Sequence, residues 1–132
     1  MKNSEMIKKF AAKIQESMIE SYKTAIECEG RIEYQIYIWE DGEIERLQTV
    51  SGDNSYLKAK DSEPRQLVYV TTVKGCNPYD CADEAIPEDE AEREAMKAEL
   101  IDWLMDEYKA TVSEKLEEAI NREENEEKYF GE

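Results

Sequence analysis

The fold is decided by residues 31–50, which read RIEYQIYIWEDGEIERLQTV. Apolar residues occupy every second position from 32 to 38, and this period of two is typical of a β-strand. Asp41-Gly42 follows, a dipeptide that favours a tight turn between two antiparallel strands. The stretch therefore predicts a β-hairpin whose second strand runs from about Glu43 to Val50.

The second strand has a less regular pattern than the first. Its apolar residues, Ile44, Leu47 and Val50, stand three apart rather than two. This spacing predicts a β-bulge near Glu45-Arg46. A third strand is expected over residues 66–73, where β-branched and aromatic residues dominate.

Helical spacing replaces alternation on both sides of the predicted sheet. Upstream, apolar residues recur at steps of three and four over residues 3–28, and Gly30 is the expected stop. Downstream, Pro87 suits the first position of a helix because its missing N–H costs nothing there. A stripe of apolar residues from Met96 to Ile120 then predicts a helix over residues 88–127, about 60 Å long at 1.5 Å per residue.

These elements give the order α-β-β-β-α, an α+β fold. A three-stranded antiparallel sheet is expected to pack with long N-terminal and C-terminal helices. The chain of 132 residues suits a single domain with one core. We expect one domain over residues 1–132, with a helix at 3–28, the sheet at 31–74, a loop at 75–87 and an acidic helix at 88–127.

The first and third strands carry apolar residues on both faces. A sheet with one face in water would alternate more cleanly. The pattern therefore predicts that the second face is covered, either by the C-terminal helix or by a second copy of the chain.

The composition is strongly acidic, with 17 Lys and Arg, 33 Asp and Glu, and a net charge of −16. Such a charge argues against direct binding of nucleic acid or of an anionic membrane, because both need basic residues. It permits a basic protein surface as the partner. No stretch approaches the ~20 apolar residues of a membrane span, and three cysteines do not suggest a secreted disulfide scaffold, so we expect a cytoplasmic protein.

No catalytic, metal or cofactor site is predicted. The chain has no histidine, which excludes Ser-His-Asp and Cys-His arrangements within one chain. Its five glycines are scattered and form no phosphate-binding loop. We therefore expect that the protein is not an enzyme. An enzyme using carboxylates alone or with Mg²⁺ is the third-ranked hypothesis.

Cys76 and Cys81 are separated by four residues, which is not the spacing of a redox motif or a zinc knuckle. Two interpretations remain, a local disulfide and two ordinary loop thiols, and the reducing cytosol favours the second. Tyr37 and Trp39 on the first strand also have two interpretations. They either pack in the interior or anchor a protein interface, where Tyr and Trp are enriched.

The charge is distributed unevenly along the chain. Residues 88–132 contain 17 acids and 6 bases, whereas residues 1–87 contain 16 acids and 11 bases. Acids three or four apart on a helix have Cβ atoms about 5–6 Å apart, a spacing of the same order as that of phosphates along a nucleic-acid strand. The acids expected to contact a partner are Glu88, Asp89, Glu90, Glu92, Glu94, Asp102, Asp106, Glu107, Glu114, Glu117 and Glu118, with Tyr37 and Trp39 as apolar anchors.

The leading hypothesis is a non-enzymatic binding protein that occupies a basic surface, the nucleic-acid site of another protein. Anti-CRISPR and anti-restriction inhibitors of phages and mobile elements resemble this chain in size and charge only, and no motif links it to a particular family. The alternative is a homodimeric structural or adaptor module that dimerises through the sheet. In that alternative the acids serve solubility, or form i,i+4 pairs with bases interspersed along the helix, namely Lys97, Lys109, Lys115, Arg122 and Lys128.

Overall fold

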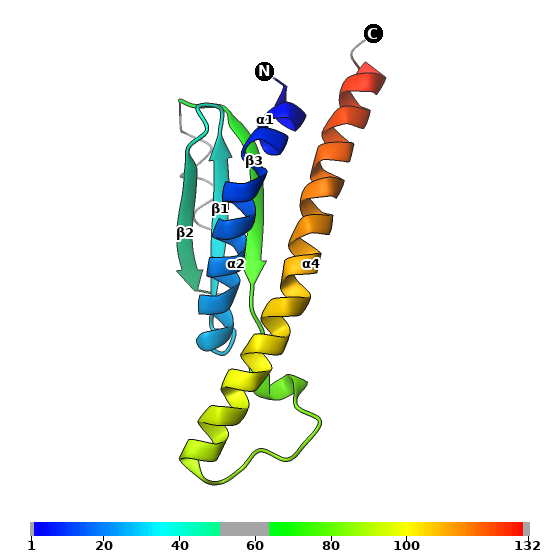
Figure 1. Ribbon diagram of the computed structural model, residues 1–132. Helices are drawn as coiled ribbons and strands as arrows, with labels where there is room; N and C mark the ends of the chain where they lie inside the picture. Colours follow the sequence, from blue (N-terminus) through cyan, green and yellow to red (C-terminus); the bar gives the residue numbers. More distant parts are fainter. Residues whose placement is uncertain (1, 51–63, 131–132) are drawn as a thin grey trace.

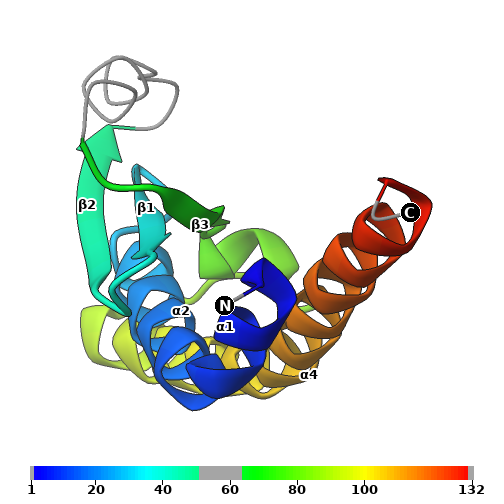
Figure 2. The same cartoon turned by 90° about the horizontal axis from the view of Figure 1, so that it is seen from above.

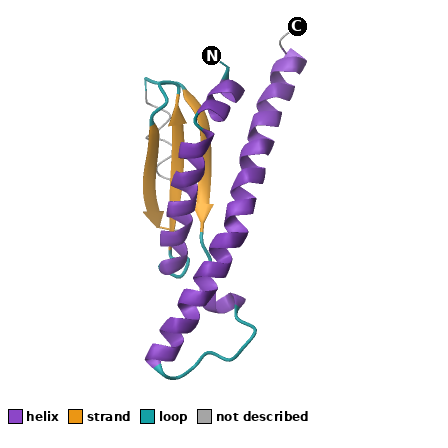
Figure 3. Cartoon of the chain, viewed as in Figure 1, coloured by secondary structure: helices purple, strands orange, loops and turns teal. Residues whose placement is uncertain are grey.

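The chain forms two N-terminal helices, a three-stranded sheet and one long C-terminal helix (Figure 1 and Figure 3). The computed structural model describes residues 2–50 and 64–130, with side chains up to Asn125. Its elements are α1 (Asn3–Lys9), α2 (Ala11–Glu27), β1 (Ile32–Trp39), β2 (Ile44–Val50), β3 (Leu67–Lys74), the 3-10 helix η1 (Pro78–Cys81) and α4 (Glu90–Phe130). The α+β class and the α-β-β-β-α order predicted from the sequence are confirmed. Residues 51–63, which fall within the range 31–74 predicted for the sheet, lie outside the described residues.

The sheet is antiparallel with the strand order β2-β1-β3, so the alternating strand lies at its centre. Pairing of β1 with β2 runs without a break from Ile32 opposite Val50 to Ile38 opposite Ile44. Pairing of β1 with β3 has one irregularity, between Ile38 and Trp39. The central strand is therefore hydrogen-bonded on both sides and fixes the register of the sheet.

The β-bulge predicted near Glu45-Arg46 is wrong. The irregular spacing of β2 instead reflects apolar residues on both faces of a regular strand. Ile44 packs against the core on the face that the helices cover, whereas Leu47 is opposite Gln35 on the other face. The three-residue step between apolar positions changes the face without changing the pairing.

The N-terminal helix predicted over residues 3–28 is divided at Phe10, whose backbone angles are φ −104° and ψ 12°. The Phe10 ring is turned toward the hairpin turn, where a Cβ added to Gly42 would lie 2.6 Å from the ring. The prediction of one continuous helix is wrong at this residue, because the spacing of apolar residues contains no information about a tertiary contact of this kind. Both helices still contribute to one core, α1 through Ile7 and α2 through Ile14.

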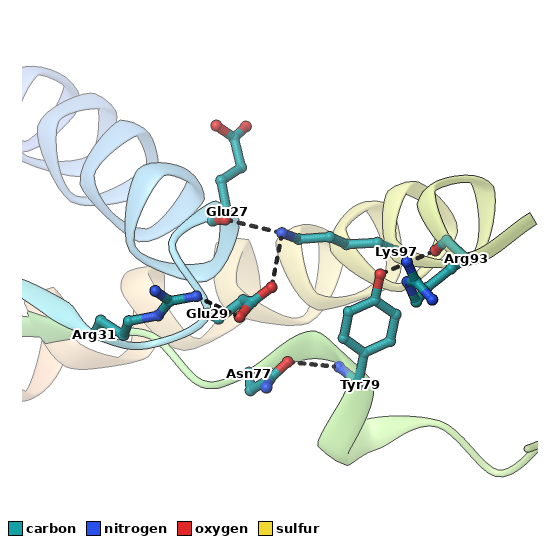
Figure 4. A network of polar contacts seen from close by, with 7 residues as sticks. All are labelled: Glu27, Glu29, Arg31, Asn77, Tyr79, Arg93 and Lys97. Carbon is teal, nitrogen blue, oxygen red and sulfur yellow. Dashed lines mark hydrogen bonds and ion pairs between the residues drawn. The ribbon is translucent and has the colours of Figure 1, made fainter. Parts of the chain in front are cut away.

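Helix α2 ends in a Schellman motif. The Gly30 N–H donates to the Ala25 carbonyl and the Glu29 N–H donates to the Ile26 carbonyl, each at 3.0 Å. Glu29 and Gly30 both have left-handed backbone angles, with φ of 59° and 79°. The stop predicted at Gly30 is therefore correct, and the motif also directs the Glu29 side chain toward α4 (Figure 4).

Helix α4 packs against α1 and α2, so the three α-helices lie on one side of the sheet (Figure 2). The prediction that this helix covers the second face of the sheet is wrong, because its apolar stripe joins the core on the side of α1 and α2. The residues of that stripe that join the core cluster are Tyr108, Val112, Leu116 and Ala119, with Ile120 packed against them. None of the described helices has both the length and the apolar character that a membrane span needs.

The boundaries of α4 differ slightly from those predicted. The helix begins at Glu90 rather than at residue 88, because Asp89 acts as its N-cap. It runs to Phe130 rather than to residue 127, and no glycine or proline occurs between residue 88 and its end to interrupt it.

Tyr22 of α2 and Tyr108 of α4 stack at the contact between the two helices, with ring centroids 3.8 Å apart. Burial raises the pKa of Tyr22 to about 12 and also raises the pKa of Tyr108. The Tyr108 hydroxyl is buried and makes no hydrogen bond with any described residue. The pair therefore favours the neutral state of both phenols, and one hydroxyl is an energetic cost to the fold.

We expect Tyr108→Phe to raise the free energy of unfolding by about 1 kcal/mol at neutral pH, because it removes a buried polar group that lacks a partner. The folded pKa of both phenols lies above the unfolded value near 10. Their ionisation therefore does not affect the free energy of unfolding below about pH 10, and it lowers this free energy as the pH rises toward about 12. The variant should therefore lose less stability than the wild type over this range in urea unfolding.

The matched control is Tyr34→Phe, because Tyr34 is also a core residue but its hydroxyl donates to Gln48 Oε1 at 3.0 Å. This variant should lose about 1 kcal/mol at neutral pH. Equal losses in Tyr34→Phe and Tyr108→Phe would contradict the prediction.

Candidate protein-binding surface

The acidic helix α4 begins with a side-chain cap. Asp89 Oδ2 accepts a hydrogen bond from the Glu92 N–H at 3.0 Å, and an acid at the helix N-terminus also suits the helix dipole. Asp89 and Glu92 are three residues apart, the spacing of a capping box. Asp89 therefore has a structural role in addition to the partner-binding role expected for it.

Lys97 fastens the N-terminal part of α4 to the end of α2 (Figure 4). Its Nζ donates to the Glu27 carbonyl at 3.0 Å and lies 3.4 Å from Glu29 Oε1. Arg31 donates to Glu29 Oε2 at 2.8 Å, and hydrogen bonds from Arg31 and then Lys97 lower the pKa of the Glu29 carboxyl. A cation at this position satisfies a carbonyl that the helix end leaves without a partner and complements the negative end of the α2 dipole.

The 3-10 helix η1 is tied to α4 by Tyr79, whose hydroxyl donates to the Arg93 carbonyl at 3.1 Å (Figure 4). Asn77 Oδ1 caps η1 by accepting from the Tyr79 N–H. Arg93 itself donates to the Glu88 carbonyl at 3.4 Å. The first two bases of α4, Arg93 and Lys97, therefore bond to backbone carbonyls, and neither bonds to an acid of its own helix.

The opposite part of α4 is fastened by an ion pair between Lys8 of α1 and Glu124. Between the two ends, Val112 and Leu116 are almost completely buried against α1 and α2. The helix is thus held at its start, along its middle and near its C-terminal end, which fixes the backbone of its outer face relative to the rest of the fold.

All eleven acids expected to contact a partner are exposed. By helical spacing, those from Asp102 to Glu118 lie on the side of α4 away from Tyr108 and Val112. Within the part of α4 whose side chains are described, no ion pair joins an acid to a base of the same helix. The i,i+4 pairing proposed for Lys97, Lys109, Lys115 and Arg122 is therefore not formed there, and the side chain of Lys128 lies outside the described residues.

Tyr37 and Trp39 do not lie near these acids. Both are 1% exposed and stand on the sheet face opposite the helices. The Arg65 guanidinium lies over the Trp39 ring, 4.4 Å from its centroid, and also pairs with Glu43 at 2.6 Å. In this conformation neither aromatic side chain is accessible to a partner.

An exposed aromatic side chain is found instead on α4. Trp103 is 53% exposed, although its place in the apolar pattern of the helix predicted a core residue. Met96, Leu100 and Trp103 are spaced by four and three residues and form a second apolar stripe beside the one that contains Leu104 and Tyr108. This second stripe is the sequence pattern that could have identified Trp103 as a residue outside the core.

The second stripe lines a groove of about 530 Å³ between α4 and the segment that follows η1. Met96, Leu100 and Trp103 form its apolar part. Three exposed acids, Asp83, Glu84 and Glu99, also line it. The groove combines apolar surface with negative charge.

Cys81 lies at the same groove, and its Sγ is 4.0 Å from Sγ of Cys76. This distance is about twice the ~2.05 Å length of a disulfide bond, so both are free thiols. Burial raises the pKa of the Cys76 thiol. Among the described residues, no three Cys, Asp or Glu side chains are grouped as metal ligands.

The acids and the groove together define the candidate surface, which consists of exposed carboxylates on a fixed helix beside an apolar hollow. Its interpretation depends on geometry and charge alone. Comparison of the chain with protein-family models, with curated proteins and with solved structures found no match.

Proposed function

We propose that this chain is a non-enzymatic binding protein that occupies a basic surface of a partner, namely the nucleic-acid site of another protein. The outer face of α4 supplies the contact. The observation that carries the proposal is the exposure of all eleven acids, nine on α4 and two directly before it, where α4 offers them no ion pair over its described side chains.

Electrostatic repulsion makes this arrangement costly in the absence of a partner. Asp102 and Asp106 are four residues apart, and Glu114, Glu117 and Glu118 form a second group at steps of three and four. Like charges at these spacings destabilise a helix by about 0.2–0.5 kcal/mol per pair. A basic groove would relieve the repulsion, and the negative field would raise the association rate with such a groove.

The attachment of α4 supports the same proposal. A helix held by Lys97 at one end, by Lys8 near the other and by the core between them fixes the backbone positions from which its acids project. Little backbone conformational entropy is then lost on binding, which leaves more of the electrostatic attraction as affinity. The proposal implies a cytoplasmic location, and the free thiols of Cys76 and Cys81 suit a reducing compartment.

The proposal is tested by capture of partners from a host lysate on the immobilised protein, washed at low and at high salt. We expect a nucleic-acid-binding protein to be retained at low salt and released at high salt, because exposed charges are screened. Excess duplex DNA or RNA should then displace the captured protein by competing for the same basic site. A partner that resists both salt and nucleic acid would refute the proposal.

The alternative is a homodimeric structural or adaptor module. Val70 favours it, because this residue is opposite Tyr37 on β3 and is 41% exposed. Against it, Gln35, Tyr37 and Trp39 are each 1% exposed within one chain, so no second copy is needed to bury them. Light scattering distinguishes the two functions, since a tight dimer whose interface is the sheet would favour the alternative.

A further inference from the structure

The groove at Trp103 is large enough for a side chain of a partner. Its volume of about 530 Å³ lies within the ~300–1,000 Å³ range of sites that bind small ligands. A smaller hollow of about 270 Å³, lined in part by Pro87, shares Glu84, Met96 and Glu99 with it. The two hollows are neighbours along the N-terminal third of α4.

The apolar part of the groove remains partly open to solvent. Met96 and Leu100 are half-buried, and Trp103 is 53% exposed. Exposed tryptophan is uncommon on a surface as charged as this one, and Trp is among the residues that most often dominate binding energy at protein interfaces. Transfer of this surface out of water provides a driving force that the carboxylates alone do not supply.

The charge around the groove determines which occupant fits. Exposed acids lie on both sides of the groove, Asp83 and Glu84 on one side and Glu99 on the other. Two further acids of this chain that are expected to contact a partner, Asp102 and Asp106, follow along α4. An apolar segment without charge would bury part of this acidic rim without compensation. A lysine or arginine next to the inserted side chain would pair with the rim or lie over the Trp103 ring.

We infer that the groove receives an apolar side chain from a partner segment that carries lysine or arginine on both sides of it. This inference rests on the proposed function and names its apolar anchor, Trp103. The anchor replaces Tyr37 and Trp39, which are buried on another face of the molecule.

A second copy of the chain does not fit this groove. Each copy has a net charge of −16, so two copies repel each other, and placing the acidic rim of one against the other is unfavourable overall. The C-terminal end of α4 lies at the opposite end of this helix from the groove (Figure 1). The favoured occupant is therefore a basic segment of a different protein.

Two short lysine-rich peptides of equal length and charge test the inference, one with phenylalanine and one with serine at its centre. We expect the wild-type protein to bind the phenylalanine peptide about tenfold more tightly, as burial of part of an aromatic ring implies. Trp103→Ala should abolish this advantage, and Trp103→Phe should retain most of it. Val50→Ala removes an apolar side chain that is 71% exposed elsewhere and should leave the advantage unchanged.

The outcomes separate the inference from the proposed function. An advantage that disappears only in Trp103→Ala supports the groove. Equal, salt-sensitive binding of both peptides by the wild type, or an advantage that survives in Trp103→Ala, overturns the groove and leaves the acidic surface in place. If neither peptide binds at low salt, both the groove and the proposed function are wrong. A wild-type dimer that Trp103→Ala converts to a monomer would assign the groove to a second copy and overturn the inference.

Discussion

Replacement of Asp106, Glu114, Glu117 and Glu118 by lysine is expected to weaken binding of a basic partner by at least about 100-fold. Each exposed ion pair contributes about 0.2–1 kcal/mol, and reversal of the charge adds repulsion to the loss of attraction. The variant should remain folded, because all four side chains are exposed and lysine has a helix propensity similar to that of glutamate. Calorimetric titration with the lysine-rich peptide that has serine at its centre measures the effect of charge without the groove.

The matched control reverses four exposed acids of α1 and α2, which are Glu5, Glu16, Glu20 and Glu27. Both variants change the net charge from −16 to −8, by four changes of two units each. If the outer face of α4 is the binding surface, the control should lose less than about tenfold. Equal losses in the two variants would mean that binding follows the overall charge, and α4 would then have no special role.

The elements of the fold could be predicted because each has its own period in the sequence. Alternation from Ile32 to Ile38 gave β1, the Asp41-Gly42 turn placed β2 beside it, and Gly30 ended α2. The errors occurred where tertiary contacts override local pattern. Phe10 divides the first helix because its ring meets the hairpin turn, and a period of two cannot show which element will cover each face of the sheet.

The candidate site could be predicted only in part, for a similar reason. Exposure of the acids on α4 follows from their positions outside the apolar stripe, and the structure places all eleven at the surface. The choice of apolar anchors is a harder problem, because it depends on which aromatic side chains remain uncovered. Trp39 is covered by Arg65, and no sequence pattern foretells a contact between residues 26 positions apart. Trp103 remains exposed because α1 and α2 pack against the other apolar stripe of α4, the one that contains Tyr108 and Val112.

Gly75→Ala is expected to lower the free energy of unfolding by about 1–3 kcal/mol, the usual cost of an added methylene in a close-packed interior. Gly75 follows β3, where the chain passes directly against α2. A Cβ at this position would lie 2.8 Å from the carbonyl carbon of Ala25 and from the backbone nitrogen of Ile26. The φ of Gly75 lies outside the left-handed region, so the cost comes from this close approach and not from backbone strain.

A double-mutant cycle identifies the atoms responsible. The Ala25 Cβ is also 2.9 Å from the added carbon, and Ala25→Gly removes this contact while the backbone contacts of α2 remain. We therefore expect Ala25→Gly to recover only a small part of the stability that Gly75→Ala loses, as measured by urea unfolding of both single variants and the double variant. Nearly full recovery would show that the methyl contact dominates. The strand β3 would then be able to shift past α2, and the position of η1 beside the groove would depend on side-chain packing instead of on the close backbone approach at Gly75.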